Sequence, residues 1–167
     1  FVKSIESSQP KLLDQHQADY QTIRSIAWSP DGKFIAFPSL RNGNSDIWSI
    51  SVGRANLKQI TKHQAFDSNP LWSPNGLRLA FQSNRSGNND IWTILASGDR
   101  PAQVTIDSYS DNPSAWSVNG KYLAFNSDRW FAKRGIGNVS IWMIPASGGR
   151  PEELVRSNMK DMQFPRN

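Results

Sequence analysis

The chain has 167 residues, of which 37% are hydrophobic and 20% charged, a composition typical of one globular unit and not of a disordered chain. It contains no cysteine, which excludes disulfides and thiolate metal sites. No run of about 20 apolar residues is available to cross a bilayer, and the N-terminal residues lack the charged-then-apolar layout of a signal peptide. A signal or anchor would therefore lie outside this chain.

A sequence motif that contains tryptophan recurs along the chain. Trp28, Trp72 and Trp116 are spaced by 44 residues, and each is followed by Ser, a turn ending in Gly and an apolar run. A repeat of about 40–45 residues with short strands and a recurring aromatic is typical of a propeller blade, which is a four-stranded antiparallel sheet. The predicted fold is all-β: a partial β-propeller of three complete four-stranded blades with pieces of further blades at both ends.

The first segment resembles the end of a repeat. Residues 10–13, Pro-Lys-Leu-Leu, are similar to residues 151–154, Pro-Glu-Glu-Leu, so residues 2–15 are predicted to be the third and outer strands of an earlier blade. Residues 1–20 would be this piece with its connector. Residues 21–62 form the first complete repeat.

The second repeat, residues 63–106, shows why each unit should have four strands. Pro74-Asn75-Gly76 is typical of a hairpin turn, and the residues after it alternate with a period of two, as in a β-strand. The predicted strands are residues 69–73, 77–83, 90–94 and 102–105, with a Gly/Asn/Ser-rich loop over 84–89.

The second strand of each repeat is expected to be covered on both faces. One face carries large apolar residues and the other a small one, where a neighbouring sheet can press close. The large residues are Ile35, Leu79, Leu123, Phe37, Phe81 and Phe125, and the small ones are Ala36, Ala80 and Ala124. Six of the seven tryptophans occupy repeat positions, which favours packing between blades over a ligand platform.

The third repeat, residues 107–156, carries a six-residue insertion between its second and third strands. The insertion brings aromatic and basic side chains together, a composition enriched at interface hot spots. The predicted contact residues are Arg129, Trp130, Phe131, Lys133 and Arg134. The alternative is that the two aromatic side chains fold back and cover the edge of the third blade.

Arginine and aspartate also recur in the loop after the second strand. Arg41 with Asp46, and Arg85 with Asp90, suggest a structural ion pair in each of the first two repeats. Ser140 replaces the aspartate in the third repeat. The pair is therefore expected to be missing there.

Residues 157–167 are predicted to begin a fourth repeat. Three blades cannot close a ring, since closed propellers have about four to eight. Either the chain is part of a longer protein, or two copies complete one ring, which makes a homodimer through incomplete blades a possible assembly.

The motifs resemble the WD40-like repeat of TolB-type β-propellers over residues 21–155. The matching residues are Trp-Ser-Pro-Asp-Gly-Lys (28–33), Ala-Phe-x-Ser-x-Arg-x-Gly-x-x-Asp-Ile-Trp (36–48 and 80–92) and Asp-x-x-Pro-x-Trp-Ser-Pro-Asn-Gly (67–76). The same repeat builds the propellers of the periplasmic TolB protein, of some serine peptidases and of sensor regions in some membrane-anchored regulators. The resemblance implies a β-propeller fold, a binding role and a periplasmic location, but it does not imply a catalysed reaction.

Polar residues before each inner strand form a second candidate site. In propellers these connections gather around one mouth of the central channel, where a polar ring could meet a peptide or a cation. The residues are Asp67, Asn69, Asp111, Asn112 and Asp161. The alternative is that their side chains cap their own turns.

The chemistry favours a non-catalytic module that binds another protein or peptide. His16 and His63 are the only histidines, and neither a Gly-x-Ser-x-Gly motif nor a metal-ligand spacing is present, so no enzyme activity, metal or cofactor is expected. The net charge is +5, but the basic residues are dispersed along the sequence. This distribution argues against direct nucleic-acid binding. The alternatives are a sensor region of a membrane-anchored transcriptional regulator and the propeller of a serine peptidase.

Overall fold

The computed structural model describes residues 25–54, 56–129 and 140–156. These residues form three four-stranded antiparallel sheets in three successive segments of the chain. The strands of the first sheet, blade 1, are β1 (Ala27–Trp28), β2 (Phe34–Ser39), β3 (Asp46–Ser51) and β4 (Leu57–Gln59). Those of blade 2 are β5 (Asp67–Trp72), β6 (Arg78–Ser83), β7 (Asp90–Leu95) and β8 (Ala102–Gln103). Those of blade 3 are β9 (Asp111–Trp116), β10 (Tyr122–Ser127), β11 (Ser140–Pro145) and β12 (Glu152–Arg156).

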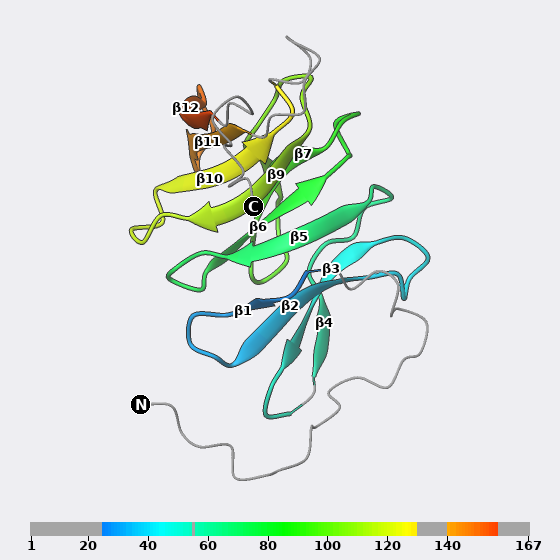
Figure 1. The fold of residues 1–167 in the computed structure, drawn as a ribbon. Coiled ribbons are helices and arrows are strands. Elements are labelled where there is room, and N and C mark those ends of the chain that lie inside the picture. Colours follow the sequence, from blue (N-terminus) through cyan, green and yellow to red (C-terminus); the bar gives the residue numbers. More distant parts are fainter. Residues whose placement is uncertain (1–24, 55, 130–139, 157–167) are drawn as a thin grey trace, which may run out of the picture.

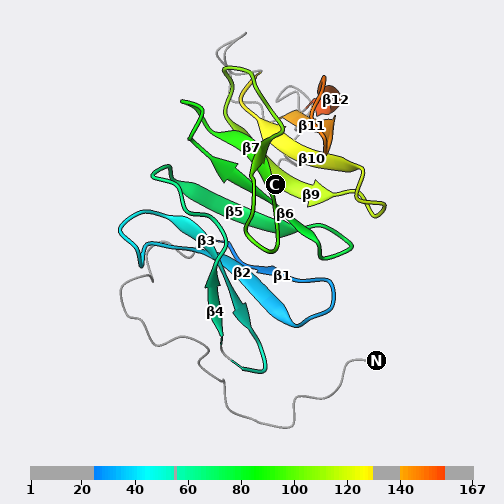
Figure 2. The same ribbon diagram turned by 180° about the vertical axis from the view of Figure 1, so that it is seen from behind.

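The sheets follow one another face to face in chain order (Figures 1 and 2). Among the described residues all regular structure is strand, and no helix is long and apolar enough to cross a membrane. The predicted all-β fold of four-stranded units is therefore confirmed. The expected strands over residues 2–15 and the expected start of a fourth repeat over 157–167 lie outside the described residues.

The hairpin between the first two strands of each blade is built by one serine side chain. In blade 2 the Ser73 hydroxyl donates to Asn75 Oδ1 at 2.8 Å and accepts the Arg78 N–H at 2.9 Å. The backbone then turns through Gly76, whose φ of 70° favours glycine. The same bonds recur around Ser29 and Ser117, so the repeated Trp-Ser motif sets the register of each hairpin.

Two apolar clusters hold the blades together, one at each interface. The cluster between blades 1 and 2 consists of Ala36, Ile47, Ile60, Leu79, Phe81 and Ile94. The cluster between blades 2 and 3 consists of Ala80, Ile91, Val104, Leu123, Phe125 and Ile144. In both, the small-residue face of one blade packs against the Leu/Phe face of the next. The expectation that both faces of the second strand are covered is confirmed for blade 2, where Leu79, Ala80 and Phe81 are fully buried.

Tryptophans complete these interfaces, as predicted for packing positions. Trp72 and Trp92 pack against the first cluster, and Trp116 and Trp142 against the second. The indole nitrogen of Trp72 donates to the Ala27 carbonyl at 3.2 Å, and that of Trp116 donates to the Leu71 carbonyl at 3.1 Å. Trp72 and Trp116 therefore each add a directed bond to the preceding blade.

Candidate functional site

The predicted polar ring lies where the inner strands β5 and β9 begin, but its two aspartates face the interior. Asp67 and Asp111 are completely buried. Asn69 and Asn112 remain half-buried and meet across the boundary between blades 2 and 3, where Asn69 Nδ2 donates to Asn112 Oδ1 at 2.7 Å. The structure thus joins the two asparagines and removes both carboxylates from the surface. Asp161 lies outside the described residues.

Asp67 is held by the arginine of the next loop of its own blade. Nη2 of Arg85 lies 2.9 and 2.8 Å from the two carboxylate oxygens of Asp67, and Nε of Arg85 donates to Ser83 at 2.9 Å. The guanidinium also covers the rings of Phe81 and Trp92, at 5.2 and 4.8 Å from their centroids. Hydrogen bonds to a charged group and contacts with aromatic faces both stabilise a buried cation.

This arrangement corrects the expected pairing of Arg85 with Asp90. Asp90 accepts hydrogen bonds from Thr105 and Gln103, both at 3.0 Å, and from Ser86. Asp46 in blade 1 accepts equivalent bonds from Thr61 and Gln59. These aspartates tie the third strand to the outer strand of the blade, and the Arg85 ion pair ties the second strand to the first.

Arg129 repeats the role of Arg85 in blade 3. It is buried, and its guanidinium donates to both oxygens of Asp111, at 3.0 and 3.1 Å, and to Asp107. It lies over Phe125 and Trp142 at 5.2 and 5.1 Å.

Two expectations change with this placement. Blade 3 does contain an Arg–Asp pair, and Arg129 is part of the interior rather than of a contact loop. The other predicted contact residues, Trp130, Phe131, Lys133 and Arg134, lie outside the described residues. Arg129 and Asp111 follow Arg85 and Asp67 by 44 residues, whereas Ser140 replaces the third-strand aspartate in this repeat. The arginine and the inner-strand aspartate are thus retained together, and this is the sequence signal for the true partners.

Burial raises the pKa of Asp111. Loss of solvent raises its pKa to about 6, against the opposing effects of the Ser127 hydroxyl and the Arg129 charge, and Asp107 adds a further negative charge nearby. Burial also raises the pKa of Asp46, although hydrogen bonds from Thr61 and the His63 backbone act in the opposite direction. Within residues 25–54, 56–129 and 140–156 no group of three or more His, Cys, Asp or Glu side chains is placed to hold a metal ion.

Exposed apolar side chains lie on loops at this same end of the blades. Leu40 follows β2, Phe66 precedes β5, and Ile106 lies between β8 and β9 with 80% of its surface exposed. Sequence reasoning missed these three residues. The signal was available, because the positions 44 residues away carry polar residues: Asn84 for Leu40, Ser110 for Phe66 and Lys62 for Ile106.

Antiparallel four-stranded sheets that pack face to face through a repeated aromatic contact define a β-propeller. The family model of the TolB β-propeller domain (PD40) matches residues 1–162, and the chain belongs to this family. It is 45% identical over 42 residues to the Tol-Pal system protein TolB of Syntrophus aciditrophicus (strain SB), which is 25% of this chain and 9% of the relative.

Solved structures support the same fold. A candidate TolB of Agrobacterium tumefaciens superposes with a TM-score of 0.74 at 25% identity, covering 88% of this chain and 52% of that one. TolB from Acinetobacter baumannii superposes with a TM-score of 0.67 at 20% identity, covering 83% and 34%. The chain therefore spans about half or less of the length of these relatives.

Proposed function

We propose that this chain is a non-catalytic scaffold for protein–protein interaction, working in the periplasm as part of a larger TolB-like propeller. Family membership supports the location, because the matched relatives carry the TolB name. The buried Arg–Asp pairs support the scaffold role, since they use the charged groups of the polar ring to join strands. A partner would meet the loops above them.

The observation that carries this proposal is the set of exposed apolar side chains on the loops at the ring end. Phe66 and Ile106 stand on connections held by hydrogen bonds: the Phe66 N–H donates to Asn84 Oδ1 at 2.8 Å, and Asn88 Nδ2 donates to the Asp107 carbonyl at 3.0 Å. Apolar side chains on an ordered loop lose little conformational freedom on binding. Such loops on a rigid scaffold commonly carry binding residues.

Site-specific photocrosslinking in the native host tests the proposal. A photoreactive residue at Phe66 or Ile106 of the full protein should give a discrete crosslink to one partner. The same residue at Val118, which is also exposed but lies on the β9–β10 turn at the opposite end, should give none. Equal crosslinks from all three positions, or none from Phe66 and Ile106, would reject the ring end as the binding surface.

Self-association is a second proposal, and the end faces of the described blades support it. In blade 2, Ile91 and Val104 are 0% and 2% exposed, whereas their counterparts in blade 3, Ile141 and Leu154, are 40% and 52% exposed. Trp28, the counterpart of Trp72, is exposed on blade 1. The Leu/Phe face of one copy therefore matches the small-residue face of another in a head-to-tail contact.

The sensor and peptidase alternatives remain distinct proposals. A regulator would place a DNA-binding domain and a transmembrane segment in the same open reading frame, and a peptidase would place an α/β-hydrolase domain with Gly-x-Ser-x-Gly there. Reading the full gene separates both from a scaffold.

A further inference from the structure

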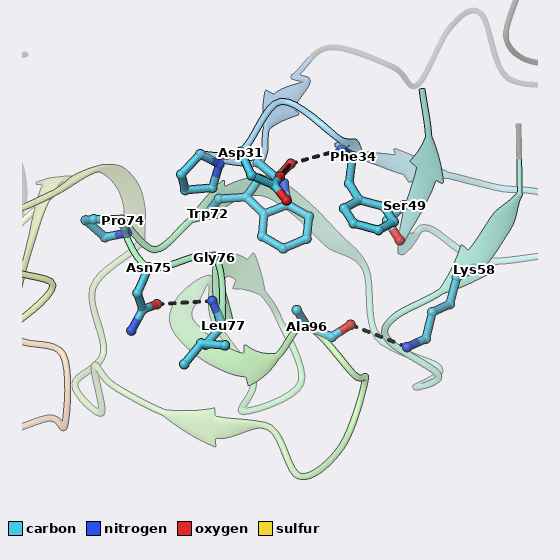
Figure 3. Close-up of a pocket in the computed structure, with 12 residues that line it drawn as sticks. Asp31, Phe34, Ser49, Lys58, Trp72, Pro74, Asn75, Gly76, Leu77 and Ala96 are labelled. Atoms are coloured by element: carbon cyan, nitrogen blue, oxygen red, sulfur yellow. Dashed lines mark hydrogen bonds between the residues drawn. The ribbon is translucent and has the colours of Figure 1, made fainter. Parts of the chain in front are cut away.

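A groove runs between blades 1 and 2 at the end of the sheets opposite the polar ring. It lies between the β1–β2 and β5–β6 turns and encloses about 600 Å³ (Figure 3). Phe34, Trp72 and Leu77 supply apolar walls, and Lys58 reaches across toward the Ala96 carbonyl at 3.5 Å. This volume lies within the range of about 300–1,000 Å³ that is usual for ligand sites.

The groove continues on the far side of Phe34. A second hollow of about 690 Å³ shares Phe34, Ser49 and Lys58 with the first and is lined further along by Lys33 and Arg54. Each hollow alone holds a drug-sized molecule. Together they offer an extended track suited to a segment of polypeptide.

The centre of this track is a rigid aromatic platform. The rings of Phe34 and Trp72 stack with centroids 6.4 Å apart at 30°. Trp72 is fixed by the bond from its indole nitrogen to the Ala27 carbonyl, and Leu77 extends the apolar surface into solvent. Because the two rings already face each other, they present a surface for an apolar side chain rather than a slot for a third ring.

The charges along the track are mainly positive. Lys33, Arg54 and Lys58 line it, and among the described residues that line the two hollows Asp31 is the one carboxylate. The Ser29 hydroxyl and the Lys33 N–H both donate to Asp31, which lowers the pKa of its carboxyl and engages it in its own turn. Lys33 also pairs with Asp31, its Nζ lying 3.6 Å from Oδ2, so the net positive charge of the track comes from Arg54 and Lys58, which are exposed.

This combination is specific to the first groove. In the next groove, between blades 2 and 3, Arg78 stands at the position of Phe34 and donates to the Thr93 hydroxyl at 3.3 Å, and Ala102 stands at the position of Lys58. Blade 3 has an aromatic residue, Tyr122, at the position of Phe34, but Glu152 stands at the position of Lys58 there, so among the three described blades the aromatic residue with a facing lysine occurs in blade 1. The fold alone does not require it.

We infer that the groove binds an extended acidic peptide segment that places one apolar side chain on the Phe34–Trp72 platform. Its carboxylates would meet Lys58, which lines both hollows, and Arg54 with Lys33 in the second hollow. This inference rests on the proposed interaction role of the chain but assigns a second surface, distant from Phe66 and Ile106. Charge complementarity would select the segment, and the platform would fix its register.

Fluorescence anisotropy with the full chain tests the inference. The probe is a fluorescein-labelled ten-residue peptide of aspartate and glutamate with two central leucines. It should bind, and the version with serines in place of the leucines should bind at least tenfold more weakly. A lysine-rich version of the same length should not bind.

Three variants test whether the peptide binds in this groove. Lys58→Glu should weaken binding at least tenfold. Lys121→Glu, the same charge change on the exposed counterpart of Leu77 in the next groove, should leave it within twofold. Phe34→Arg introduces the residue that the repeat itself uses at Arg78, and it should weaken binding at least fivefold although it adds a positive charge. Thermal melts of each variant confirm that the fold is kept.

Several outcomes would overturn the inference. Unchanged or tighter binding to Phe34→Arg would mean simple charge attraction, and equal losses in Lys58→Glu and Lys121→Glu would mean nonspecific binding. Competition by a single-stranded oligonucleotide of equal charge at the same concentration would assign the groove to nucleic acid. If the peptide does not bind but Phe66 still gives its crosslink, the groove inference alone is rejected. If the peptide binds but Phe66 gives no crosslink, the ring-end proposal alone is rejected.

Discussion

At the residue scale, the buried arginines are the feature that most affects stability. Arg85 and Arg129 each lie over two or three aromatic rings and pair with a buried aspartate. A buried ion pair contributes modestly compared with an apolar replacement of both partners. Removal of one partner is much more costly, because the other charge is then buried alone.

Arg85→Met should therefore destabilise the chain by about 3–5 kcal/mol, since Asp67 would be left buried without its partner. Asp67→Asn should also destabilise the chain. If Asp67 only bound a ligand, the same substitution would change stability little. The double variant Arg85→Met with Asp67→Leu should recover a substantial part of the loss. Urea denaturation of the wild type, Arg85→Met, Asp67→Leu and the double variant gives the coupling free energy. Additive losses would mean that the pair does not exist in solution.

Asp111 makes stability depend on pH. Its pKa is about 6 in the folded chain and is 3.8 for an ordinary aspartate, so its folded form keeps a proton that the unfolded form has already lost. The stabilisation from this group is complete below pH 3.8 and is lost as the pH rises through 6, a change on the order of 3 kcal/mol. The free energy of unfolding, measured by urea between pH 4 and 7, should fall relative to that of Asp111→Asn. A constant difference between the two proteins would contradict the raised pKa.

At the element scale, each hairpin depends on a serine whose hydroxyl replaces missing backbone bonds. Ser73 does this for β5 and β6, because its oxygen accepts the Arg78 N–H and donates to Asn75. The turn is then closed by the bond from the Gly76 N–H to the Ser73 carbonyl at 2.8 Å. The repeated motif thus codes for a turn and not for a site.

Ser73→Ala should lower the free energy of unfolding by about 1–2 kcal/mol, because the Arg78 N–H loses its acceptor in a partly buried turn. Ser97→Ala, in the exposed turn after β7, serves as the matched control and should change it by less than about 0.5 kcal/mol. Chemical denaturation measures both values. Equal effects would show that the hydroxyl bond is unimportant to the hairpin.

The strand pattern was predicted correctly from sequence, whereas Arg85 was assigned the wrong aspartate and the groove was not predicted. Leu79, Ala80 and Phe81 alternate with period two and recur every 44 residues, so their two covered faces follow directly. The partner of Arg85 depends on hairpin register, which sets Ser83 opposite Asp67, while proximity along the chain favoured Asp90. The groove depends on how the Phe34 and Trp72 side chains meet across two blades, and a one-dimensional pattern does not contain that information.

At the scale of the whole molecule, the chain consists of blades that contact their neighbours in sequence. The faces that meet are alike at both interfaces, so the exposed face of blade 3 carries the same type of surface that blade 2 buries. Apolar surface of this kind favours association between copies.

Sedimentation velocity over a range of concentrations should reveal a head-to-tail assembly. Ile141→Asp places a charge on the exposed face of blade 3 and should shift the chain to the monomer. Ile106→Asp makes the same change on a loop at the ring end and should not. Both side chains are exposed, so neither change should unfold the protein. A wild-type chain that stays monomeric at all concentrations would reject the assembly.

The coverage of blade 2 on both faces also sets an order in which the chain opens. In an array where each unit is stabilised by its neighbours, the inner unit opens only after an outer one. Amide hydrogens of β6 and β7 should therefore exchange with solvent most slowly, and those of β2, β3, β10 and β11 faster. Any molecule that seats against Ile141 and Leu154 would make blade 3 an inner unit as well, so slowed exchange in β10 and β11 would report that contact at a distance from the bound surface.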